Sequence, residues 1–162
     1  MKQNYFISIF LLITISLAAC SGIIQDDTVI VYQESEENFM TEVTYPKETN
    51  AVEFDMNMAY IGVGNCVHIL QFANPKHYDV TGIHCGLNGV VQSLVLNDEI
   101  LFVGAGDTVY ALDINNPGMI TQKGIFETRG EVYKMLFSND FLYVAEGEMG
   151  VEKLDVANPG EM

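Results

Sequence analysis

The stretch VYALDINNP at residues 109–117 decides the fold, because the chain repeats it. VHILQFANP at 67–75 and VEKLDVANP at 151–159 have the same layout, and successive copies begin 42 residues apart. A fixed period of this length is typical of repeat architectures, in which each copy is one structural unit. Every copy ends in an Asn-Pro pair, which predicts a structural turn at the same point of each unit. The turn residues are Asn74, Pro75, Asn116, Pro117, Asn158 and Pro159.

Two further blocks share this spacing. YIGVGN at 60–65 returns as FVGAGD at 102–107, and GVVQSLVLND at 89–98 returns as EVYKMLFSND at 131–140. Matched blocks at one offset establish the repeat independently of the Asn-Pro pairs.

Each unit contains four short runs rich in Val, Ile, Leu, Phe and Tyr, separated by turn residues. In the second unit these runs cover residues 90–96, 100–105, 108–114 and 120–127. Such residues favour strands, and nothing after the N-terminal segment shows a sustained helical period. Four antiparallel strands per unit predict an all-β fold of repeated blades, that is, a partial β-propeller. A sandwich or an open β-solenoid shares the spacing, but the tight repeat favours blades.

The units at 67–75, 109–117 and 150–159 resemble the LVIVD repeat of bacterial and archaeal surface proteins. The third unit, GVEKLDVANP, is the most similar, and the first departs at Gln71, where the repeat has Asp. The resemblance covers the chain from about residue 50 onward. It implies a propeller-like extracellular domain and brings no catalytic residues with it.

The repeat divides the chain into three segments. We predict a signal peptide at 1–19, a tether with a degenerate half-repeat at 20–50, and blades at 51–162. The half-repeat rests on the likeness of residues 27–43 to 107–123. Since the last unit is truncated before its fourth strand, we expect the sequence to be a fragment of a longer protein. The alternative is a short chain that another copy completes, so self-association stays open.

The N-terminal segment MKQNYFISIFLLITISLAACSG has one cation, then an apolar stretch, then small residues. This is the layout of a secretory signal helix, and the stretch is short for a membrane span. The ending Leu17-Ala18-Ala19-Cys20 resembles the lipobox of bacterial lipoproteins, which implies that Cys20 carries a lipid. The alternative is an ordinary signal peptide with an accidental cysteine. The same resemblance implies that Ser21, directly after the cysteine, favours sorting of the protein to the outer membrane, on its periplasmic face or at the cell surface.

The composition excludes some classes of partner. The chain has 22 Asp plus Glu against 7 Lys plus Arg, a formal net charge of −15. Such a surface repels phosphate backbones, so we expect no nucleic-acid partner. The glycine-rich stretches GVGN and GAGD precede strands rather than helices, so they do not predict phosphate binding. No nucleophile motif is present either, so we expect no catalytic residues and no cofactor.

Two cysteines remain beside Cys20. If the hairpin turns at Pro75-Lys76, Cys66 and Cys85 lie opposite each other, and an exported protein can keep the disulfide that this predicts. The alternatives are two buried thiols, or a metal site that includes the neighbouring histidines His68 and His84. Because His84 and Cys85 are adjacent on a strand, their side chains point to opposite faces, so we expect no metal.

Asp113 and Asp155 end the third strand of their units, just before the Asn-Pro turn. One reading makes them cation ligands at the rim of the propeller. The other has their carboxylates accept backbone N–H groups in the turn, and repetition of the same residue at the same place favours it. Tyr110 and Tyr133 are candidates for a binding face, although aromatic residues in such strands are usually core.

Taken together, these patterns favour a lipid-anchored binding or scaffold protein of the cell envelope. Its partner would be a protein or glycan that neither motif nor spacing identifies. The alternative is a fragment of a propeller hydrolase or lyase whose catalytic residues lie in other blades. A third possibility is the inert product of an interrupted gene.

Overall fold

The computed structural model describes residue 45 and residues 48–161. Within them the secondary structure is β, apart from the short 3-10 turns η1 (Pro117–Met119), η2 (Gly147–Met149) and η3 (Pro159–Glu161). The strands, sheet by sheet, are β1 (Ala51–Asp55), β2 (Met58–Val63), β3 (Cys66–Asn74) and β4 (His77–Cys85); β5 (Val91–Asn97), β6 (Ile100–Ala105), β7 (Thr108–Asp113) and β8 (Thr121–Glu127); β9 (Lys134–Ser138), β10 (Phe141–Ala145) and β11 (Val151–Asp155).

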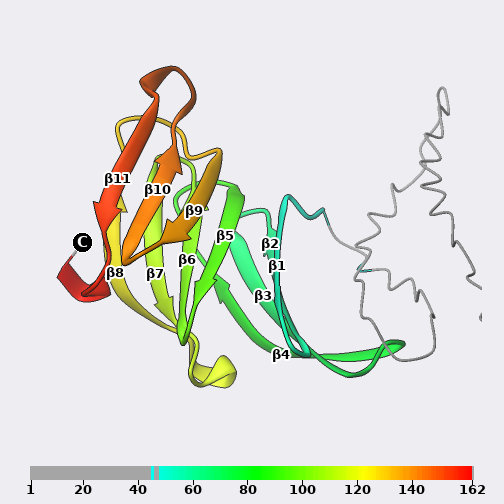
Figure 1. Cartoon of the computed structure of the whole chain (residues 1–162). Coiled ribbons are helices and arrows are strands. Elements are labelled where there is room, and N and C mark those ends of the chain that lie inside the picture. The colour runs from blue at the N-terminus through cyan, green and yellow to red at the C-terminus, as the bar shows by residue number, and fades with distance from the viewer. Residues whose placement is uncertain (1–44, 46–47, 162) are drawn as a thin grey trace, which may run out of the picture.

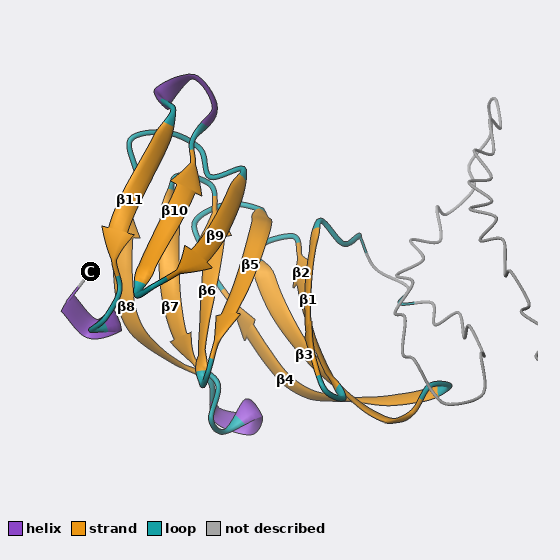
Figure 2. Ribbon diagram, viewed as in Figure 1, coloured by secondary structure: helices purple, strands orange, loops and turns teal. Residues whose placement is uncertain are grey.

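Each sheet is an antiparallel meander, in the orders β1-β2-β3-β4, β5-β6-β7-β8 and β9-β10-β11. We call these sheets blade 1, blade 2 and blade 3. Figures 1 and 2 show the blades side by side, with β5 between β1 and β9. The prediction of an all-β fold of repeated antiparallel sheets is therefore confirmed. The predicted signal helix and the half-repeat at 27–43 lie outside the described residues.

The first hairpin of every blade closes through a two-residue turn. Met56, Asp98 and Asn139 take the first turn position, with φ angles of 49°, 51° and 50°. The next residue in blade 2, Glu99, accepts a hydrogen bond from the N–H of Ile114 at 2.9 Å, which ties the turn to the chain leaving the third strand. In the equivalent bonds, the N–H of Phe72 donates to Asn57 O in blade 1 and the N–H of Val156 donates to Asp140 O in blade 3.

The structure corrects the alignment of the first strands by one residue. The N–H of Val91 bonds to Gly64 O in blade 1, and it is Val132, 41 residues on, that makes the equivalent bond to Gly106 O in blade 2. Gly89 thus corresponds to Gly130, not to residue 131. The loop after β10 is one residue longer than the loop after β6, because Ala145 pairs with Val151 where Gly104 pairs with Val109. The segment that leads into β9 is one residue shorter than the one that leads into β5, and the loop after β10 is one residue longer than its counterpart. The two changes cancel, so the Asn-Pro pairs keep their spacing.

Two of the three buried clusters lie between blades, and the third packs Tyr45 against blade 1. One cluster joins blade 1 to blade 2 through side chains such as Ile69 and Leu101, and a second joins blade 2 to blade 3 through Phe102 and Leu142. Burial of this apolar surface is what stacks successive sheets.

A glycine and a valine meet at each junction between blades. A Cβ on Gly62 would lie 2.6 Å from Cγ1 of Val91, and a Cβ on Gly104 would lie 2.4 Å from Cγ1 of Val132. Both valines are completely buried. The missing side chain therefore lets the first strand of the next blade approach the second strand of the previous one.

Among the described residues, no helix is long and apolar enough to cross a bilayer.

Gly104→Ala tests this junction. The new methyl group would overlap Val132 in a well-packed site, so we expect the free energy of unfolding to fall by about 1–3 kcal/mol. Gly118→Ala is the matched control, since a Cβ there would meet nothing closer than Asn116 Oδ1 at 3.5 Å. Denaturant unfolding measures both variants, and equal stability of the two would contradict the close approach.

Candidate functional site

The first strands of the three blades, β1, β5 and β9, border one groove. Its volume is about 560 Å³, and it opens along the strands where the blades converge. The residues that line it come from equivalent positions of each blade: Asn50, Ala51, Val52, Glu53, Gln92, Ser93, Leu94, Val95, Leu96, Tyr133, Lys134, Met135, Leu136 and Phe137.

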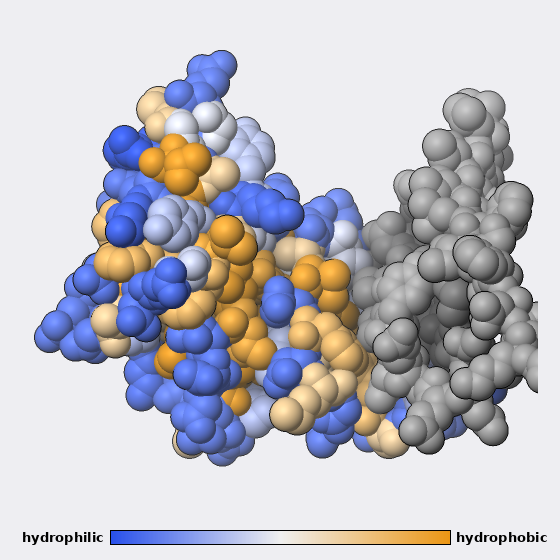
Figure 3. All heavy atoms as spheres, viewed as in Figure 1, coloured by the Kyte–Doolittle hydropathy of each residue, from blue (hydrophilic) through white to orange (hydrophobic). Residues whose placement is uncertain are grey.

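Apolar side chains give the groove an exposed contact surface. Leu136 on β9 is 64% exposed and Val52 on β1 is 52% exposed, although both belong to regular strands. Figure 3 shows hydrophobic residues gathered over β5 and β9 and beside them over β1, with hydrophilic residues around them. Exposed apolar groups that gather in a concave site mark surfaces used for binding more often than scattered ones do.

Polar side chains supply hydrogen-bonding groups on the same surface. Asn50 and Gln92 bring amide groups and Lys134 an exposed ammonium group. Glu53 is half-buried among them, and this burial raises the pKa of its carboxyl. A groove with both apolar contacts and amide donors and acceptors suits a protein or glycan surface better than a purely apolar ligand.

Tyr133 lies at the edge of this groove, contrary to the expectation that it belongs to the core. It is 56% exposed, because the neighbouring Val132 takes the buried position and the two side chains point to opposite faces. Tyr110, by contrast, is buried, and its hydroxyl accepts the N–H of Asn88 at 2.9 Å. No sequence signal separated the two tyrosines, since both stand in similar apolar runs.

A cluster of charged groups lies at the loop between β10 and β11, which contacts Tyr133 of the groove through Gly147. The side chain of Glu146 is fully buried, and its Oε2 lies 3.4 Å from Nη2 of Arg129. Nε of the same arginine lies 3.4 Å from Oε1 of Glu152. Both oxygens of Glu146 and Oε2 of Glu152 are buried without a hydrogen-bond partner. Burial raises the pKa of Glu146, the adjacent Glu152 raises it further, and Arg129 opposes them. No motif in the sequence predicts this cluster, whose members come from three separate segments.

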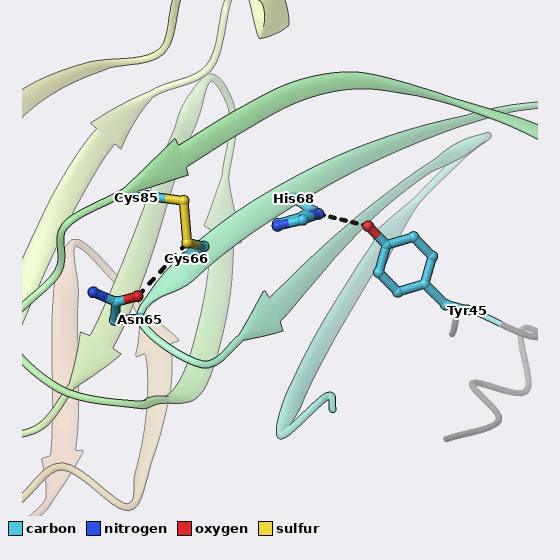
Figure 4. Close-up of a disulfide and its surroundings, with 5 residues drawn as sticks. All are labelled: Tyr45, Asn65, Cys66, His68 and Cys85. Atoms are coloured by element: carbon cyan, nitrogen blue, oxygen red, sulfur yellow. Dashed lines mark hydrogen bonds between the residues drawn. A yellow bond between two sulfur atoms is a disulfide. The ribbon is translucent and has the colours of Figure 1, made fainter. Parts of the chain in front are cut away.

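Cys66 and Cys85 lie directly opposite each other on β3 and β4, joined by a disulfide bond with their Cα atoms 4.1 Å apart. The hairpin contains two irregularities, one between Phe72 and Asn74 and one between Ile69 and Leu70. They fall on opposite strands and offset each other, which leaves the cysteines in register. Figure 4 shows the bond at the end of the hairpin, with the amide of Asn65 beside it.

His68 is buried away from the disulfide, and its Nδ1 is hydrogen-bonded to the hydroxyl of Tyr45 at 2.5 Å, as Figure 4 shows. Within residues 45 and 48–161, no three His, Cys, Asp or Glu side chains gather in a way that could hold a metal ion.

The repeated turn residues bond to the backbone beside them. The carboxylate of Asp113 accepts the N–H of Asn115 at 3.0 Å, and that of Asp155 accepts the N–H of Ala157 at 3.1 Å. The bond from Asn115 and the salt bridge to Lys123 lower the pKa of Asp113. In the same way, the side-chain oxygens of Asn74 and Asn116 accept the backbone N–H groups of Lys76 and Gly118. Pro117 and Pro159 begin the 3-10 turns η1 and η3, whereas Pro75 lies in the tight β3–β4 turn, and Cys20 lies outside the described residues.

The fold is similar to two solved structures. The computationally designed Ika8 protein matches with a TM-score of 0.58 and 17% sequence identity, over 72% of this chain and 36% of that one. BamB from Moraxella catarrhalis matches with a TM-score of 0.57 and 16% identity, over 73% and 37%. The chain therefore spans little more than a third of either structure. No protein-family model matches the sequence, and neither does any curated protein.

Together, the stacked meanders and the likeness to BamB show that the fold is that of β-propeller blades.

Removal of the disulfide tests its part in stability. We expect Cys66→Ala/Cys85→Ala to lose about 3 kcal/mol of unfolding free energy, because a bridge that closes a loop of this size restricts the unfolded chain by that amount. Reduction of the unsubstituted protein should cost the same, whereas a reductant should leave the double variant unchanged. Thiol labelling of both cysteines in the unreduced folded protein would contradict the bond.

Proposed function

We propose that the protein is a lipid-anchored binding scaffold of the bacterial cell envelope, whose groove along β1, β5 and β9 holds a protein or glycan partner. Cys20 carries the lipid, and the propeller blades present the groove on the side of the membrane to which the protein is exported.

One observation carries the binding role. Val52 of blade 1 and Leu136 and Tyr133 of blade 3 are exposed in one groove, beside the amides of Asn50 and Gln92. Isolated apolar residues on a surface need no explanation, but a concave group with polar groups at its border favours recognition.

The envelope location rests on the sequence. The apolar stretch followed by Leu17-Ala18-Ala19-Cys20 supports export and lipidation. The resemblance of the repeats to LVIVD units also favours a surface protein. A cross-strand disulfide fits an oxidising compartment outside the cytoplasm.

Cys20→Ala tests the anchor. In a Gram-negative host grown with labelled palmitate, we expect the unsubstituted chain to take up the label and to enter the detergent phase. The variant should do neither, because the thiol is the acceptor and acyl chains supply the membrane affinity. An unlabelled mature protein with an intact Cys20 would contradict lipidation.

Leu136→Asp and Val52→Asp test the groove. We would screen a form with its full set of blades against purified envelope proteins and envelope glycans. For a ligand that binds, each substitution should weaken affinity at least about tenfold, since a charge is placed in the contact surface. Ile125 on β8 is 47% exposed and does not line the groove. Ile125→Asp is therefore the control and should bind normally. A ligand indifferent to both groove variants would contradict the assignment.

A further inference from the structure

We propose that Arg129, Glu146 and Glu152 form a proton-operated latch, which holds the loop at 146–150 and, through Gly147, the ring of Tyr133 at the border of the groove.

The charges of this cluster do not balance while both carboxyl groups are ionised. Two carboxylates face one guanidinium group, and that group is 56% exposed to water while Glu146 is fully buried. Both ion-pair contacts measure 3.4 Å, longer than the 2.7–2.9 Å or so of a strong charged hydrogen bond. Three carboxylate oxygens of the pair are buried without a well-formed hydrogen bond, and Oε2 of Glu146 has only the long contact with Arg129. One proton held between Glu146 and Glu152 supplies the missing donor and makes the cluster neutral.

In blade 2 the equivalent contact uses a side-chain amide in place of the arginine. Thr128 donates its N–H to Asp107 O as Leu87 does to Asn65 O, so Arg129 takes the place of Asn88. The amide of Asn88 donates to Asp107 Oδ1 at 3.1 Å, and its backbone N–H donates to the Tyr110 hydroxyl at 2.9 Å.

One side-chain amide and one backbone N–H are therefore enough to tie one such loop to the next. In blade 3 the equivalent contact contains a buried carboxyl pair, which makes it depend on pH.

In this proposal the loop that the cluster holds moves as a unit. Gly147 and Gly150 have φ angles of 58° and 86°, a conformation that glycine adopts without strain and that suits a hinge. Backbone bonds close the loop on itself, from Glu146 N–H to Gly150 O at 2.8 Å and from Met149 N–H to Glu146 O at 3.1 Å. Glu146 is thus the point at which the loop is fastened to the blade.

Tyr133 connects this loop to the groove. A Cβ on Gly147 would lie 2.8 Å from Cε2 of the tyrosine ring, so the ring covers the glycine closely. The backbone N–H of Tyr133 bonds to Ala145 O at 2.9 Å, directly before Glu146. Displacement of the loop therefore removes the surface on which the ring rests.

The direction of the switch follows from the charges. Below the pKa of the shared proton the cluster is neutral and the latch is closed. Above it, two buried carboxylates repel each other beside one arginine, and the loop is released. The other titratable groups that face this region are Tyr133, Glu131 next to its hydroxyl at 3.4 Å, and Glu148 in the loop. Since burial raises the pKa of Glu146, its stabilising contribution is complete at acidic pH and disappears as the pH rises through that raised pKa.

A proton explains the cluster better than a metal ion does. Arg129 already brings a positive charge to both carboxylates and would repel a divalent cation. In the part of the chain that the structure describes, no third acidic or histidine side chain completes a set of ligands.

The consequence for binding rests on the proposed function: acid would fix Tyr133 at the groove, and alkali would release it. The latch itself needs no ligand for its test, so its failure and that of the groove can be told apart.

Tyr133→Trp provides the probe, because the chain contains no tryptophan. We expect its fluorescence to shift to longer wavelength in one sigmoidal step as the pH rises through the raised pKa of Glu146. In Tyr133→Trp/Glu146→Gln the amide keeps the cluster neutral, so the emission should stay at its acidic value throughout. Tyr133→Trp/Glu148→Gln is the matched control, since Glu148 is an exposed acid of the same loop, and it should keep the step.

Hydrogen exchange of the unsubstituted chain gives a second readout that does not alter Tyr133. After correction for intrinsic rates, protection of the Glu146 and Gly150 amides should fall over the same pH range, and Glu146→Gln should abolish that fall. A step that persists in both Glu146→Gln experiments, or no step in the unsubstituted cluster, would overturn the latch. A shift produced at constant pH by calcium would overturn it in favour of a metal site.

Discussion

The contact between a glycine and a valine at each junction of blades is the constraint on which the rest of the structure depends. Val91 fits over Gly62, and Val132 fits over Gly104, where any side chain would collide with the valine. The contact fixes how closely one blade approaches the next and therefore how β1, β5 and β9 converge. The buried clusters between the blades form around it, and the groove is the open side of the same convergence.

The groove and the junctions between blades differ in the polarity of their side chains. Between the blades, side chains such as Leu101 and Phe102 are fully buried and apolar. Along the first strands, apolar groups stay exposed beside amides, and in blade 3 a buried carboxyl pair lies at the loop that contacts Tyr133. Natural proteins depart from a fully satisfied core chiefly where function requires it. The departures here gather around Tyr133, which both the groove and the latch use.

Much of the fold could be predicted from the sequence, because strand composition and turn residues are local signals. The runs expected in the second unit coincide with β5 to β8 within a residue or so. The one-residue shift before β9 could not be predicted, since a longer loop after β10 conceals it in the spacing. The exposure of Tyr133 and the meeting of Arg129 with Glu146 depend on how separate segments pack, which no short motif records.

The most direct test of the account is the contact at the junctions in solution. In protein with labelled valine methyl groups, nuclear Overhauser effects should join Val91 to the Hα atoms of Gly62 and Val132 to those of Gly104. Strong effects at both pairs are the result that the structure predicts, because the atoms lie in van der Waals contact. If both valines instead showed effects only within their own blades, the blades would not stack as described, and the groove between their first strands would not exist.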